Sequence, residues 1–142
     1  MRCMRAILLI TAIMLAAAPA LAEPTILTGT VSHIRDGDTI EVGKVPVRLN
    51  GVSAPELKEP LGLQSKQFMI DLVLDRPVSC ELSGEKTYDR LVGTCYRADQ
   101  DIGAAVIKAG LALDCPRYSG GRYAQYEVDG ARQRIKLPRY CR

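Results

Sequence analysis

The sequence predicts an α+β domain that combines a five-stranded β-barrel of Greek-key topology with about three helices. Three predicted strands, a helix, two further strands and a helical C-terminal part follow one another along the chain. This is the order expected of a small Greek-key barrel with an inserted helix. About 120 residues follow an N-terminal leader, and this length suits one domain with one core.

The first 22 residues have the features of a cleaved signal peptide. Arg2 and Arg5 form a positive n-region, residues 7–18 are apolar, and Ala20-Leu21-Ala22 is a small-residue cleavage site. An uncleaved anchor is the alternative, but the apolar segment is shorter than the about 20 residues that span a bilayer. We therefore predict a secreted or periplasmic mature chain, residues 23–142, that is monomeric and outside the membrane.

The first three strands are predicted in residues 25–52. Residues 25–42 are rich in Thr, Val and Ile, and Asp36-Gly37-Asp38 interrupts them as a turn signal, which is typical of a hairpin. Residues 45–52 alternate apolar and other side chains, so they predict a third strand that ends before Ala54-Pro55.

The remaining elements follow from changes in periodicity. Helical spacing of apolar residues predicts helices at 61–74, 102–113 and 123–135, the last ending before Pro138. A turn is expected around Ser119-Gly120-Gly121. Residues 77–82 and 91–96 are predicted to be the fourth and fifth strands, joined by the polar connection 83–90.

Four cysteines remain after the leader, at positions 80, 95, 115 and 141. An even number of cysteines in an exported chain indicates two disulfides. We favour Cys80–Cys95, because both lie in predicted strands on either side of one connection, and Cys115–Cys141, which would tie down the C-terminal tail. A zinc site is the weaker alternative, since the chain has no C-x-x-C pair and His33 lies far away in sequence.

The charge is unevenly distributed. Residues 23–114 contain 10 Lys and Arg against 14 Asp and Glu, whereas residues 115–142 contain 7 against 2. A basic tail is consistent with binding to a polyanion, and an ordinary solvated tail is an equal alternative.

Short motifs in a fixed order carry the specific signal. They are Asp36-Gly37-Asp38-Thr39, the segment 48–56 (RLNGVSAPE), Tyr88-Asp89-Arg90, and Asp101-Ile102 leading into residues 109–112 (AGLA). Together they resemble the thermonuclease, or staphylococcal-nuclease-like, family over nearly the whole mature chain. The resemblance implies an OB-fold and a calcium-dependent nuclease that acts on DNA or RNA.

The residue types in these motifs suit phosphodiester hydrolysis on their own terms. Arg48 and Arg90 can hold phosphate oxygens bidentately, and Glu56 can orient or deprotonate the attacking water. Asp38, on a tight turn, can bind a hard cation such as calcium. In the family that the chain resembles, these positions are the phosphate-binding arginines, the catalytic glutamate and a calcium ligand. Taken singly, Arg48 and Glu56 would be an ordinary surface pair.

One position departs from the family's pattern. The resemblance implies a second calcium-binding aspartate at position 53, where this chain has Ser53, and a backbone carbonyl ligand at Ala54. Calcium affinity follows the number of charged ligands, so we expect a weak calcium site.

Aromatic and basic residues alternate after the second predicted helix. Tyr118, Tyr123 and Arg122 are candidates for binding nucleic acid, by stacking on bases and by holding the backbone, and packing is the alternative.

The alternative function for the whole chain is a non-catalytic OB module of the cell envelope that binds an oligonucleotide or an oligosaccharide. Similar domains occur among proteins associated with exopolysaccharide, such as succinoglycan.

Overall fold

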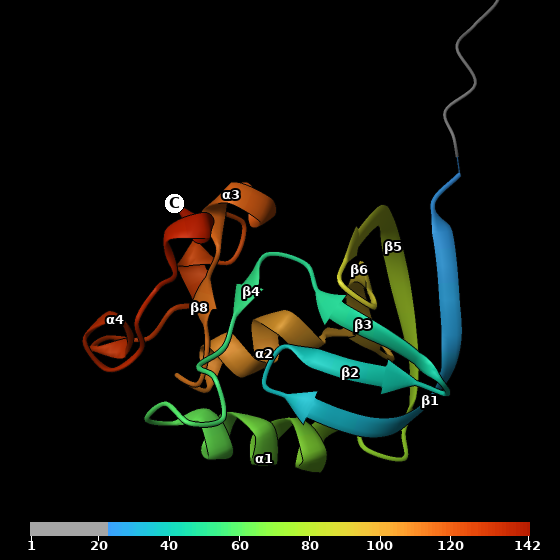
Figure 1. Cartoon of the computed structure of the whole chain (residues 1–142), viewed down its shortest axis with the longest axis horizontal. Helices are drawn as coiled ribbons and strands as arrows, with labels where there is room; N and C mark the ends of the chain where they lie inside the picture. Colours follow the sequence, from blue (N-terminus) through green and yellow to red (C-terminus); the bar gives the residue numbers. More distant parts are fainter. Residues whose placement is uncertain (1–22) are drawn as a thin grey trace, which may run out of the picture.

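The computed structural model of the protein describes residues 23–142, and the predicted signal peptide lies outside the described residues. A curled sheet and helix α1 occupy one part of the molecule, and the C-terminal helices surround a second, smaller sheet (Figure 1). The predicted α+β class and the OB-like barrel are confirmed. None of the helices in residues 23–142 is long and apolar enough to cross a membrane.

The barrel is formed by one continuous sheet. Its order is β3-β2-β1-β5-β6-β7, and β3 also pairs in parallel with β6, so the sheet returns to itself. The strands are β1 (Thr25–Asp36), β2 (Thr39–Val42), β3 (Val45–Leu49), β5 (Pro77–Thr87), β6 (Arg90–Arg97) and the short β7 (Gln100–Asp101).

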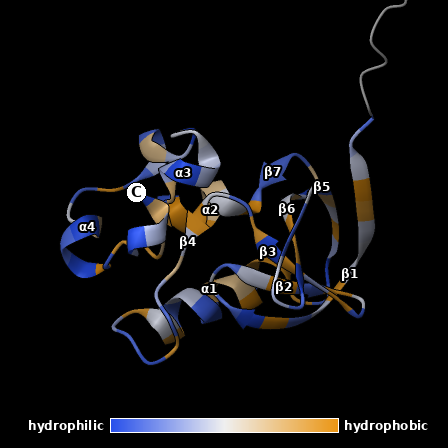
Figure 2. Cartoon of the chain, turned by 45° about the horizontal axis from the view of Figure 1, so that its top comes forward, coloured by the Kyte–Doolittle hydropathy of each residue, from blue (hydrophilic) through white to orange (hydrophobic). Residues whose placement is uncertain are grey.

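Helix α1 (Gly62–Val73) and helix α2 (Ile102–Lys108) contribute to the core of this barrel. The Asp101 side chain caps α2 by accepting a hydrogen bond from the Ala104 N–H at 3.0 Å. Hydrophobic residues lie on α2 and on the strands of the curled sheet (Figure 2). The fully buried members of this core include Val31, Ile40, Val47, Met69, Val73, Ile102, Val106 and Ile107.

The third predicted strand and the second predicted helix are each shorter than expected. Gly51, with φ +73°, ends β3 early and starts β4 (Val52–Ser53). Gly110, with φ +72°, follows the end of α2, and the next residues form β8 (Leu113–Asp114), which pairs with β4. Glycine adopts a left-handed conformation without a Cβ penalty, so both breaks occur where the chain must turn sharply.

The predicted helix at 123–135 is wrong. The structure has a one-turn α3 (Pro116–Ser119), a 3-10 turn η1 (Ala124–Tyr126), a one-turn α4 (Ala131–Arg134) and a 3-10 turn η2 (Arg139–Cys141). Gly130 lies in the left-handed region at φ +77° and separates η1 from α4. Helical spacing in the sequence did not reveal that Tyr123 turns into the core, where it is 2% exposed.

The connection expected at 83–90 is instead a strand hairpin. β5 continues to Thr87 and β6 begins at Arg90, with Tyr88 in a left-handed turn at φ +58° and a register irregularity between Leu82 and Lys86. Backbone pairing does not require apolar side chains, so this exposed extension left no hydrophobic pattern in the sequence.

Both predicted disulfides are present. Cys80 and Cys95 are directly opposite each other on β5 and β6, with Cα atoms 4.0 Å apart. Cys115 follows β8 and is joined to Cys141 in η2, with Cα atoms 4.6 Å apart. In the chain-entropy view, closing a loop of this length contributes about 3 kcal/mol, so each bond is important to a small domain.

We expect Gly37→Ala to destabilise the fold. A Cβ at position 37 would lie 2.7 Å from the Cβ of Ala54 and 2.8 Å from that of buried Ser65, and would also overlap the Ser65 hydroxyl. Overpacking of this kind costs about 1–3 kcal/mol, which urea denaturation can measure as a loss of unfolding free energy.

Gly43→Asn is the matched control for this substitution. Gly43 has φ +61° and no atom within 4 Å of a built Cβ, and asparagine tolerates the left-handed region. We expect a change below about 1 kcal/mol. Equal losses in the two variants would contradict the packing explanation.

Candidate functional site

The mouth of the barrel contains a cavity of about 770 Å³. Asp38, Arg48, Glu56 and Arg90 all line it, although they come from the β1–β2 turn, β3, the segment after β4, and the start of β6. The sequence-predicted catalytic residues therefore share one cavity. Among the predicted nucleic-acid-binding residues, only Tyr118 also lines it.

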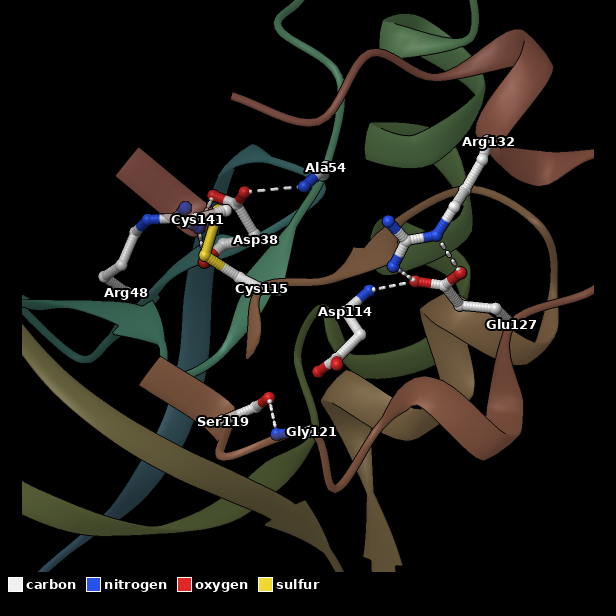
Figure 3. The surroundings of a disulfide bond; sticks show 10 residues. All are labelled: Asp38, Arg48, Ala54, Asp114, Cys115, Ser119, Gly121, Glu127, Arg132 and Cys141. Atoms are coloured by element: carbon white, nitrogen blue, oxygen red, sulfur yellow. Dashed lines mark hydrogen bonds and ion pairs between the residues drawn. A yellow bond between two sulfur atoms is a disulfide. The ribbon is translucent and has the colours of Figure 1, made fainter. Parts of the chain in front are cut away.

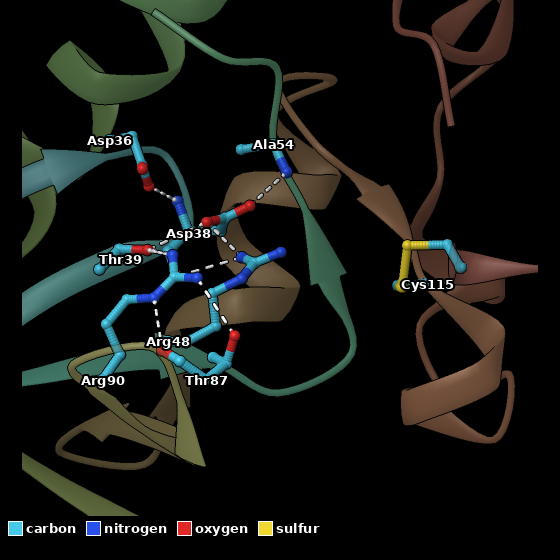
Figure 4. Close-up of polar contacts among 9 residues, drawn as sticks. Asp36, Asp38, Thr39, Arg48, Ala54, Thr87, Arg90 and Cys115 are labelled. Carbon is cyan, nitrogen blue, oxygen red and sulfur yellow. Dashed lines mark hydrogen bonds and ion pairs between the residues drawn. A yellow bond between two sulfur atoms is a disulfide. The ribbon is translucent and has the colours of Figure 1, made fainter. Parts of the chain in front are cut away.

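Asp38 is the most buried charged residue of the cavity, at 6% exposure. The Asp36 carboxylate accepts a hydrogen bond from the Asp38 N–H at 3.0 Å, which fixes the turn. One carboxylate oxygen of Asp38 accepts a hydrogen bond from the Ala54 N–H at 2.8 Å, and the other forms an ion pair with Arg48 (Figure 4). Asp38 thus connects the turn to β3 and to the segment after β4.

Arg48 lies in the middle of the barrel's closing strand. Its neighbours in register are Thr39 on β2 and Val92 on β6, and its side chain is 14% exposed. Burial acts to lower the pKa of Arg48, but the negative charge and hydrogen bond of the nearby Asp38 carboxylate oppose it, and the pKa lies above its ordinary value. The guanidinium is therefore a fixed positive charge at the cavity wall.

Arg90 brings a second guanidinium to the same place. Its Nη1 donates a hydrogen bond to the Thr39 hydroxyl at 3.2 Å, and its Nε donates to the Thr87 carbonyl at 3.3 Å. Figure 4 shows the side chains of Arg48 and Arg90 converging over β2. Within residues 23–142, Arg90 has no carboxylate as an ion-pair partner. Its charge is thus available to an anion.

Glu56 is an exposed acid of the cavity, as is Glu85 on β5. It follows Pro55, and its backbone N–H donates a hydrogen bond to the Glu59 carboxylate at 2.8 Å. No hydrogen bond to a residue of the range 23–142 engages the Glu56 carboxylate itself. A carboxylate that lines an arginine-rich cavity without a partner is suited to orienting or deprotonating a water molecule.

The candidate calcium ligands form an incomplete set. Ser53 is 2% exposed, lies on β4 opposite Leu113 and is not among the cavity-lining residues. Ala54 lies next to Asp38, as its backbone hydrogen bond requires. Over residues 23–142, no three His, Cys, Asp or Glu side chains are grouped so as to hold a metal. The oxygen atoms that could bind a cation are those of the Asp38 carboxylate, the Asp36 carboxylate and the neighbouring backbone. Because Asp38 already forms an ion pair with Arg48, this set fits only a low-affinity calcium site.

Tyr123 and Arg122 do not reach the cavity. The Tyr123 hydroxyl donates to the Asp101 carboxylate at 2.9 Å and accepts a hydrogen bond from Arg122 at 2.7 Å. The same Arg122 nitrogen donates to Thr94 at 2.8 Å. The structure places these two residues in a polar network beside α2, so packing, the alternative considered from the sequence, describes them better.

Two tyrosines that the sequence reasoning did not select line the cavity with Tyr118. Tyr88, 95% exposed, has the Arg90 guanidinium 5.7 Å from its ring centre, and Tyr140, 49% exposed, is next to the disulfide residue Cys141. Tyr88 could have been found from its place in the Tyr88-Asp89-Arg90 motif. Tyr140 is far from the motif residues in sequence. Only the predicted Cys115–Cys141 disulfide, together with the position of Cys115 at the cavity, would have indicated it.

A closed barrel whose mouth holds two arginines, an unengaged glutamate and exposed tyrosines defines an anion site of the kind that suits a phosphate diester. The comparison with known proteins agrees with this class. Residues 46–134 match the family described as staphylococcal nuclease homologue, and the chain belongs to this family.

Individual relatives include both nucleases and a protein named for another process. The chain is 41% identical over 115 residues to the succinoglycan biosynthesis protein ExoI of Rhizobium meliloti, covering 72% of this chain and 59% of that protein. It is 32% identical over 97 residues to an uncharacterized endonuclease of Haemophilus influenzae, covering 65% and 54%. It is 29% identical over 141 residues to the micrococcal nuclease of Shigella flexneri, covering 88% and 79%. The chain thus spans less than two thirds of the first two relatives.

Burial raises the pKa of Asp38 from 3.8 to about 7, although Arg48 opposes this shift. The folded chain therefore retains a proton that the unfolded chain releases, and stability from this group is lost as the pH rises from about 4 through about 7. We therefore compare the wild type with Asp38→Asn in calcium-free buffer. As the pH rises through this window, the unfolding free energy of the wild type minus that of the variant should fall by at most about 1.4 kcal/mol per pH unit.

Urea denaturation of both proteins at several pH values measures this difference. Asparagine at position 38 can still accept the hydrogen bond from the Ala54 N–H, so the variant keeps that contact while losing the titrating group. A difference that stays constant between pH 4 and pH 8 would refute the assignment.

Proposed function

We propose that this protein is an exported nuclease that hydrolyses phosphodiester bonds of DNA or RNA. The observation that carries the proposal is the convergence of Arg48, Arg90 and Glu56 on one cavity at the barrel mouth. Membership of the staphylococcal nuclease homologue family and similarity to proteins named as nucleases support it.

The chemistry follows from the side chains of the cavity. Arg48 and Arg90 bind the non-bridging oxygens of the phosphate and stabilise the charge that grows on them in the transition state. Glu56 accepts a proton from the attacking water. Arg90 is available for this role at once, whereas Arg48 must exchange part of its interaction with Asp38 for the phosphate. A phosphate diester also carries a negative charge, so it can replace part of that interaction.

Calcium belongs to this proposal as a weakly bound cofactor. Asp38 would hold it together with the Ala54 carbonyl, and when bound it would supply positive charge beside the phosphate. Ser53 removes the carboxylate that the family resemblance leads us to expect, which accounts for the incomplete ligand set. We accordingly propose that activity requires a high calcium concentration, on the order of 10⁻³ M.

Export is proposed on two grounds. The N-terminal leader of residues 1–22 fits a signal peptide, and two disulfides connect the described part of the chain. Disulfides of this kind persist in the periplasm or outside the cell and are rare in the cytosol.

A second candidate function is a non-catalytic envelope module that binds an oligonucleotide or an oligosaccharide. The similarity to a succinoglycan biosynthesis protein favours it, as does the engagement of Asp38 by Arg48. The two candidates differ in whether bound nucleic acid is cleaved.

We expect Glu56→Gln to lower the rate of cleavage of single-stranded DNA or RNA about 100- to 10,000-fold in calcium, because it removes the general base while keeping the shape. Gel assays on the oxidised mature protein, with calcium or with a chelator, measure this rate. Glu59→Gln is the control, since Glu59 is on the same exposed segment and its amide still accepts the Glu56 N–H bond. Binding without cleavage in the wild type would support the envelope module instead.

We expect Ser53→Asp to increase the apparent calcium affinity about 10- to 100-fold, because it restores a charged oxygen ligand. Ser53→Asn has nearly the same shape without the charge and serves as the control. The calcium-induced rise in melting temperature measures affinity independently of cleavage. Identical calcium responses in the aspartate and asparagine variants would argue against our account of the metal site.

A further inference from the structure

The C-terminal tail reaches the cavity because of a disulfide. Cys141 in η2 is bonded to Cys115, and Cys115 itself lines the cavity. Helix α3, which follows Cys115, packs against η2. Figure 3 draws Asp38 and Arg48 among the residues around this disulfide, and Figure 1 shows the C-terminus beside α3. The residue before Cys141 is thus held at the wall of the phosphate site.

That residue, Tyr140, lines the cavity with a partly exposed ring. Its side chain is 49% exposed, in contrast to Cys141, which is completely buried. Tyr140 and Arg48 line the same cavity, as does Cys115, to which the tail is bonded. An exposed aromatic side chain beside a phosphate-binding arginine is a combination typical of sites for single-stranded nucleic acid.

We propose that Tyr140, held beside Arg48 by the Cys115–Cys141 disulfide, is a nucleobase-binding residue. This inference rests on the proposed function, and it names the part of the substrate that the tail recognises. Arg48 takes the phosphate, and the Tyr140 ring stacks on a base attached to the neighbouring sugar. Tyr118 lines the same cavity from α3, so the tail adds an aromatic surface to one already provided by the helix.

The charge of the tail agrees with a nucleic acid ligand. Residues 115–142 contain 7 Lys and Arg against 2 Asp and Glu, and exposed Arg139 is next to Tyr140. Basic side chains attract a phosphate backbone whatever its sequence, whereas an aromatic ring binds the base. Tyr140 and Arg139 therefore perform separable tasks on one short segment.

The Cys115–Cys141 disulfide makes this recognition depend on one covalent bond. Loss of this bond alone would release the last residues of the chain from Cys115, while the β3–β6 pairing and the Cys80–Cys95 bond would remain. A protein without the Cys115–Cys141 bond should thus still bind phosphate groups and should lose its preference for strands that carry bases.

Binding measurements with two probes test the proposal. The probes are a fluorescent single-stranded DNA of about eight nucleotides and an abasic deoxyribose-phosphate strand of the same length. The Glu56→Gln background keeps both strands intact during titration. Tyr140→Ala should weaken binding of the base-carrying strand about 10-fold and leave binding of the abasic strand nearly unchanged, because stacking is lost and phosphate contacts remain. Tyr140→Phe should keep most of the affinity.

Two further variants separate position from charge. Cys115→Ser/Cys141→Ser should reproduce the selective loss seen in Tyr140→Ala, with circular dichroism used to verify that the barrel remains folded. Arg139→Gln should weaken binding of both strands equally, since it removes a charge and no stacking surface.

The outcomes distinguish this inference from the proposed function. Equal effects of Tyr140→Ala on both probes, or no effect on either, would overturn the role of Tyr140. The proposed nuclease function would still stand if cleavage by the wild type depends on Glu56. Failure of the Glu56→Gln protein to bind either strand, together with an inactive wild type, would overturn both. Tyr140-dependent binding of an acidic oligosaccharide in place of DNA would overturn the nucleobase assignment and favour the envelope module.

Discussion

The parallel pairing of β3 with β6 is the constraint on which the site depends. These strands are separated by α1 and β5 in sequence, and their pairing sets Arg48 opposite Val92, two residues beyond Arg90. Both guanidinium groups therefore reach the space over Thr39. Without closure of the sheet, the arginines would lie on separate edges, and neither could act with the other on one phosphate. Glycine at position 93 allows β6 to lie close to its other neighbour, β5, since a Cβ there would lie 3.0 Å from the Glu81 carbonyl oxygen.

Asp38 connects this closure to the rest of the cavity, and it does so with a buried charge. Its carboxylate accepts the Ala54 N–H and pairs with Arg48, so the turn, β3 and the segment leading to Glu56 move together. Burying a carboxylate is costly, and these contacts offset only part of the cost, since burial still raises the pKa of Asp38. The same contacts compete with a cation for the oxygen atoms.

The C-terminal part is held by different forces from the barrel. Its apolar cluster is small, with Leu113, Ala131 and Ile135 at its centre, and its helices are single turns that are marginal alone. The Cys115–Cys141 bond and the hydrogen bonds from Tyr123 to Asp101 supply the missing constraint. A segment stabilised in this way can present exposed side chains such as Tyr140 at a fixed place, which a free tail could not do.

Local periodicity, turn residues and cysteine positions were enough to predict the barrel strands, helix α1 and both disulfides. The short motifs pointed to Asp38, Arg48, Glu56 and Arg90, which the structure brings to one cavity. The sequence did not determine the fate of residues 123–135, the hairpin extension at 83–90 or the pairing of β4 with β8. Nor did it separate Tyr123, which points into the core, from Tyr140, which reaches the cavity. These points depend on contacts between distant segments, and a local pattern carries no information about which partner a backbone or a ring will meet.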